Sequence, residues 1–168
     1  MNHKIQALGA LLAAVVAVMA APAQAQDAAA VPTLRPTPGK AACVVVPTTV
    51  ADKALRAELC VTGGSFSHDV YQLKLDGALV LKGIDDETTK GLRGTRDGKA
   101  VTLVCAPQNI PPKASAEDIQ RIVPGYPADK TKELVELMSS GFSSVELGRQ
   151  CKASLDEAPV LTVQVLFE

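Results

Sequence analysis

Short runs in which apolar and polar residues alternate recur along the chain after residue 41, and this period of two is typical of half-buried β-strands. In the run at residues 70–75, for example, Tyr71, Leu73 and Leu75 share one face. The pattern predicts eight strands. They lie at residues 42–46, 55–62, 70–75, 78–84, 91–95, 99–105, 143–153 and 159–167.

Two dipeptides between these runs predict tight hairpin turns. Asp76-Gly77 separates two of the runs and Asp97-Gly98 separates two others. Asp-Gly favours a two-residue turn because both central positions of such a turn need a positive φ. Neighbouring strands should therefore pair antiparallel. No internal repeat is evident beyond these two turns.

The pattern changes after residue 106. Pro107, Pro111 and Pro112 are expected to end the strand series, because proline has no backbone N–H to donate to a sheet. Ser115 and Asp118 have the spacing of a capping box, which predicts a short helix to about residue 123. A second helix is expected at residues 129–139. The predicted fold class is α+β: a mainly antiparallel β-sheet of seven or eight strands with a short two-helix insertion, stabilised by disulfides.

The first 25 residues have the three parts of a secretory signal peptide. A polar start with Lys4 precedes an apolar stretch to about residue 21, and Ala23-Gln24-Ala25 offers the small-x-small pattern of a cleavage site. We therefore expect export by the general secretory route to the periplasm, with secretion as the alternative. Residues 26–40 are rich in Ala and Pro and are interpreted as a flexible tether, followed by one folded domain at residues 41–168.

Charge argues against two classes of partner. The chain has 17 basic and 18 acidic side chains, and the predicted signal peptide contains one of the lysines and no acid. The remaining chain therefore has a net charge near −2. Neither nucleic acid nor an anionic membrane surface is expected to attract such a chain.

Four cysteines follow the predicted signal, namely Cys43, Cys60, Cys105 and Cys151. An even number of cysteines in an exported chain predicts disulfides. Three pairings are possible, and we favour Cys43–Cys60 with Cys105–Cys151 because each pair joins neighbouring predicted strands. A zinc site is disfavoured because no two cysteines are close in sequence. Redox activity is disfavoured because there is no Cys-x-x-Cys motif.

No catalytic residue, metal ligand or cofactor is predicted from motifs. His68 is the only histidine after the signal, and its neighbours Ser65, Ser67 and Asp69 are too close in sequence to form a triad with it. The acidic run at residues 85–87 lacks the spacing of a calcium loop and is expected to be a solvated turn. Glycan binding is disfavoured because the chain has no Trp.

Two surfaces remain as candidates for binding a partner. The first is the loop at residues 63–69, with Phe66 and His68. The second is the connector at residues 108–126, with Tyr126 as an anchor. Separately, if the acidic run with Asp85 and Asp86 is functional, we expect it to contact a basic protein. The leading hypothesis is a non-enzymatic periplasmic module that binds or inhibits another exported or envelope protein. The alternatives are a carrier of a small apolar ligand, and a hydrolase whose site is assembled only in the fold.

Overall fold

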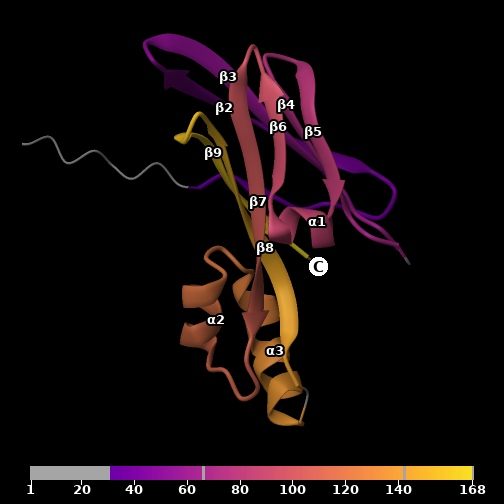
Figure 1. Cartoon of the computed structure of the whole chain (residues 1–168). Helices are drawn as coiled ribbons and strands as arrows, with labels where there is room; N and C mark the ends of the chain where they lie inside the picture. Colours follow the sequence, from indigo (N-terminus) through magenta and orange to yellow (C-terminus); the bar gives the residue numbers. More distant parts are fainter. Residues whose placement is uncertain (1–30, 66, 142, 168) are drawn as a thin grey trace, which may run out of the picture.

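The protein is a sandwich of two β-sheets from which a pair of helices projects (Figure 1). The computed structural model describes residues 31–65, 67–141 and 143–167. One sheet has the order β2-β3-β4-β5 and the other the order β1-β9-β8-β7-β6. The strands are β1 (Thr33–Leu34), β2 (Ala41–Val50), β3 (Lys53–Thr62), β4 (Val70–Leu75), β5 (Ala78–Ile84), β6 (Leu92–Arg96), β7 (Lys99–Ile110), β8 (Val145–Leu155) and β9 (Ala158–Leu166). The helices are α1 (Asp85–Lys90), α2 (Ala116–Ile122) and α3 (Ala128–Ser139).

The mainly β character, the two-helix insertion and the antiparallel pairing are confirmed, but the strand count is not. The described residues contain nine strands in two sheets, where seven or eight in one sheet were predicted. The ninth is β1, which pairs parallel to β9 and buries Leu34. Residues 33–40 therefore belong to the folded part, although the sequence suggested a tether there. Two residues are too few to give a period that sequence analysis can detect. The predicted signal peptide lies outside the described residues.

Two-residue turns join β2 to β3, β4 to β5, β6 to β7 and β8 to β9, all at one end of the sandwich. Both predicted turns, at Asp76-Gly77 and Asp97-Gly98, are confirmed. Two more turns have the same positive φ at both central residues without glycine, Ala51-Asp52 (φ 48° and 61°) and Asp156-Glu157 (φ 48° and 68°). The right-handed twist of the flanking strands favours this turn geometry.

The core lies between the two sheets. Side chains that are fully buried come from the inward faces of the central strands, among them Leu59, Tyr71, Leu73, Leu103 and Val163. Burial of one such side chain stabilises the fold by about 1.5–3 kcal/mol, so these buried side chains together are the main source of stability.

The two sheets contain an internal repeat. Residues 75–81 (LDGALVL) and 155–161 (LDEAPVL) occupy the same hairpin of each four-stranded meander. The Asp76 N–H donates to the Arg56 carbonyl at 2.8 Å, and the Arg56 N–H donates to the Asp76 carboxylate at 2.9 Å. Asp156 and Ala100 form the same two bonds, each of 2.8 Å. Each hairpin also has a bulge of one residue, at Val80 and at Val160.

The disulfides are the two that were favoured, Cys43–Cys60 and Cys105–Cys151. Each joins residues directly opposite each other on neighbouring antiparallel strands. Their Cα atoms are 4.0 and 3.9 Å apart, which identifies both as non-hydrogen-bonded pairs. Two disulfides fit an oxidising, extracytoplasmic compartment.

This pairing explains two prolines within strands. Pro107 was expected to end its strand, yet β7 continues to Ile110. Pro107 is two residues from Cys105 and therefore also in a non-hydrogen-bonded pair, so its missing N–H is not needed for the ladder with β8. Pro47 lies four residues from Cys43 on the edge strand β2, and its nitrogen likewise faces away from β3. Proline at that position limits pairing of the edge with another chain.

The helical arm consists of α2, α3 and the ends of β7 and β8 that carry them (Figure 1). It has its own small core, which includes Ile110, Ile119 and Met138. The predicted capping box is confirmed, since the Ser115 hydroxyl accepts from the Asp118 N–H and the Asp118 carboxylate accepts from the Ser115 N–H. These bonds from Ser115, with the nearby Arg121, hold the pKa of Asp118 below its usual value.

Candidate functional site

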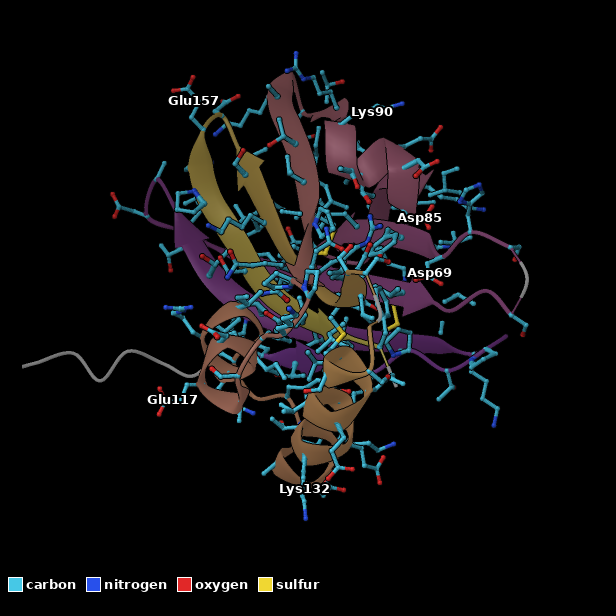
Figure 2. All side chains as sticks on the ribbon, turned by 90° about the horizontal axis from the view of Figure 1, so that it is seen from below. Asp69, Asp85, Lys90, Glu117, Lys132 and Glu157 are labelled. Atoms are coloured by element: carbon cyan, nitrogen blue, oxygen red, sulfur yellow. A yellow bond between two sulfur atoms is a disulfide. The ribbon has the colours of Figure 1, made fainter. Side chains whose placement is uncertain are left out.

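Two predicted binding regions come together at the end of the sandwich opposite the two-residue turns. The loop between β3 and β4 brings His68, and the start of α1 brings Asp85 and Asp86. His68 Nδ1 lies 2.7 Å from Asp85 Oδ1. We call His68, Asp69, Asp85, Asp86 and Arg149 the His68 corner. Figure 2 shows Asp69 and Asp85 close together on neighbouring elements.

The acidic run is a short helix, not the solvated turn that was expected. The Thr88 and Thr89 hydroxyls donate to the Asp85 carbonyl at 2.8 and 2.9 Å, and the Glu87 carboxylate accepts from the Ile84 N–H at 3.0 Å. The Glu87 bond satisfies the N–H of the residue before the helix and so favours the helical turn over an open loop. Asp86 and Glu87 remain exposed on its surface.

Asp69 connects the loop to this helix. Its carboxylate accepts from the Gly64 N–H at 2.9 Å, which closes the loop on itself. Its carbonyl accepts from the Asp85 N–H at 3.2 Å. The position of His68 beside Asp85 is therefore supported by the two hydrogen bonds of its neighbour Asp69, one to the carboxylate and one to the carbonyl. Phe66, which was predicted to take part, lies outside the described residues.

Arg149 connects the His68 corner to β8 through hydrogen bonds of its side chain. It lies on the inward face of β8 and is only 7 % exposed. Its guanidinium donates to the Asp85 carbonyl at 2.8 Å and to the Thr89 hydroxyl at 2.9 Å, and its Nε donates to the Glu146 carboxylate at 2.6 Å. The sequence offered no signal for this role, because β8 and α1 are about 60 residues apart.

Tyr71 brings a buried hydroxyl close to these charges. The phenol is fully buried, and its oxygen has no hydrogen-bond partner among the residues that the structure describes. Burial raises the pKa of the phenol far above its usual value. The positive charge of Arg149 lowers this pKa, whereas the negative charges of Asp69, Asp85 and Glu146 raise it further. At neutral pH the group is therefore an uncharged phenol.

Because an unpaired buried hydroxyl is costly, we expect Tyr71→Phe to stabilise the protein by about 1 kcal/mol. Urea unfolding followed by circular dichroism would measure this as a higher midpoint with an unchanged slope. A lower midpoint for the variant would mean instead that the hydroxyl has a partner in solution, such as a bound water beside Arg149.

The corner has some of the groups that catalysis or metal binding would use. Asp85 orients the imidazole as the acid of a catalytic triad does, but in the described part of the chain no hydroxyl hydrogen-bonds to His68. His68, Asp85 and Asp86 bring ligand atoms within 4.8 Å of one another and are the residues that could hold a divalent cation. The arrangement is otherwise an exposed, mainly acidic surface with a rigid base.

Tyr126 does not join the His68 corner. It lies on the helical arm, where it lines an open depression with Lys130, Glu133, Leu134 and Leu137. It packs partly against the core of the arm. The second predicted surface is therefore separate from the first, although both lie at the same end of the sandwich.

None of the described helices is long and apolar enough to cross a membrane. In comparisons with protein-family models, with curated proteins and with solved structures, nothing matches this chain. What is inferred about function therefore depends on the geometry above.

Proposed function

We propose that this protein is a non-enzymatic binding module of the cell envelope, and that its His68 corner contacts a basic segment of another exported protein. The observation that carries the proposal is the rigid presentation of exposed acidic groups. Asp86 and Glu87 lie on a helix whose first carbonyl accepts three hydrogen bonds, one of them from the buried Arg149. A preorganised surface loses less conformational entropy on binding than a flexible one.

The two alternative functions have less support. A carrier of an apolar ligand needs a cavity, whereas fully buried side chains from both sheets pack against each other in the interior. A hydrolase of the triad type needs a nucleophile that hydrogen-bonds to His68, and among the described residues the hydrogen bond of the imidazole is to the Asp85 carboxylate. Both surfaces that remain are exposed and have only open depressions, which suits contact with a macromolecule.

The test is affinity capture of a partner with two matched charge reversals. The mature, oxidised protein would be immobilised as wild type, as Asp86→Lys and as Glu136→Lys, which reverses an acid that is also exposed, on α3. Envelope and secreted proteins of the same cells would be passed over all three and quantified by mass spectrometry.

We expect one partner that is retained by the wild type and by Glu136→Lys and is lost with Asp86→Lys. The purified partner should bind Asp86→Lys at least about tenfold more weakly, and binding to the wild type should weaken with added salt. Equal capture by all three proteins, or a partner insensitive to salt, would refute contact through this corner. Loss with Glu136→Lys alone would move the contact to the helical arm and also refute it.

A further inference from the structure

We propose that the Cys43–Cys60 disulfide is a thiol–disulfide exchange site, whereas Cys105–Cys151 is purely structural. The two bridges provide a matched comparison, because each joins directly opposite residues of neighbouring antiparallel strands. They differ in where the sulfurs lie. This inference is independent of the proposed protein contact, since it concerns the outer face of β2 and β3 and none of the residues of the His68 corner.

The first difference is access. Cys105 and Cys151 are both fully buried in the core between the sheets. Cys43 is exposed on the edge strand β2, while its partner Cys60 is 4 % exposed. Exchange requires a thiolate to approach one sulfur directly, so access decides which bridge reacts and which of its sulfurs is attacked. Of the four cysteines, Cys43 alone is an exposed residue, and we therefore assign the attack to it.

The second difference is the charge beside the sulfur that would leave. Lys74 Nζ lies 3.9 Å from Cys60 Sγ, and Glu58 Oε1 lies 3.1 Å from it. Lys74 and Glu58 also form an ion pair of 3.1 Å. An ammonium group stabilises a neighbouring thiolate and so favours its departure, while a carboxylate opposes it. The leaving sulfur therefore has one favourable and one unfavourable charge that can be removed separately.

The proposed reaction takes a thiol as its substrate, either a small thiol or the dithiol of a redox protein. Its thiolate attacks Cys43 Sγ and forms a mixed disulfide, the Cys43–Cys60 bond breaks, and the electron pair stays on Cys60 Sγ beside Lys74. A second thiolate then attacks the sulfur of the first reductant and releases Cys43 as a thiolate. In sum, two thiols are oxidised to one disulfide and the protein disulfide is reduced to two thiols.

The experiment follows both bridges in one folded protein. The oxidised mature protein would be incubated without oxygen with excess reduced glutathione, or with reduced thioredoxin as a protein dithiol. Samples would be quenched with acid, alkylated and analysed by peptide mass spectrometry, with circular dichroism as the control for folding. We expect labelling at Cys43 and Cys60 at least about 100-fold faster than at Cys105 and Cys151, and a glutathione adduct on Cys43 only.

Three charge variants test the role of the neighbours. Lys74→Gln is expected to slow reduction about threefold, and Glu58→Gln to accelerate it about threefold. Lys82→Gln is the control, because it removes an exposed charge from β5 in the same sheet and should change nothing. Reaction with thioredoxin alone would identify a protein dithiol as the substrate, and reaction with both would include small thiols. Equal rates for the two bridges, an adduct on Cys60, or reduction only after unfolding would overturn the proposal.

Discussion

Removal of the Cys105–Cys151 disulfide by Cys105→Ala with Cys151→Ala is expected to lower the free energy of unfolding by about 4 kcal/mol. This bridge closes the longer loop, because its cysteines are 46 residues apart and the segment between them contains the whole helical arm. Without it the unfolded chain gains conformational freedom, and two core positions lose packing. Thermal unfolding should show the midpoint falling by roughly 10–15 °C.

The other bridge is the internal comparison for this prediction. Cys43 and Cys60 are 17 residues apart, so their replacement by alanine should cost only about 3 kcal/mol and should disturb the edge of one sheet. If both double variants lost the same stability, or if the exposed bridge mattered more, loop length and burial would not be the controlling factors.

Arg149→Met is expected to lower the free energy of unfolding by about 3 kcal/mol and to loosen α1. The substitution leaves the Glu146 carboxylate without the hydrogen bond that Arg149 Nε donates to it. It also removes the donors to the Asp85 carbonyl and the Thr89 hydroxyl. Breaking one side of a buried charge pair costs about 3–5 kcal/mol, and the value here should be at the low end because Glu146 is partly exposed. Urea unfolding would measure the loss, and hydrogen exchange would show faster exchange in α1.

Two further variants separate the causes. Lys152→Met removes an exposed cation from the same strand and should change stability by less than about 0.5 kcal/mol. Adding Glu146→Gln to Arg149→Met should recover part of the loss, because no carboxylate is then left without a partner. If α1 exchanged no faster in Arg149→Met, the view that Arg149 supports the His68 corner would be wrong.

Local sequence signals predicted the parts of this fold that depend on local geometry. The Asp76-Gly77 and Asp97-Gly98 turns follow from the positive φ that a tight hairpin needs, and the start of α2 follows from Ser115 and Asp118. The disulfide pairing followed from the expectation that sequential strands are neighbours. Each of these inferences needed only residues close together in sequence or a simple meander.

Features that depend on distant residues could not be predicted in this way. Ala51-Asp52 and Asp156-Glu157 form the same type of turn without glycine, because the ladders on both sides determine it. The bonds of Arg149 to Asp85 and Thr89 become visible only once the fold brings the Arg149 side chain of β8 to α1. Of the candidate site, His68, Asp85 and Asp86 were found from sequence, but their proximity was not.

The internal repeat has a consequence for how this molecule can diverge. In each meander the second and third strands are joined at the same end, by the loop at residues 63–69 in one half and by the segment at residues 111–144 in the other. The two connections are topologically equivalent, yet one is a short loop and the other contains two helices. This end therefore tolerates large changes in length while the paired two-residue turns fix the opposite end. Both candidate contact surfaces lie where evolution can lengthen, exchange or redesign the chain without altering the core that supports it.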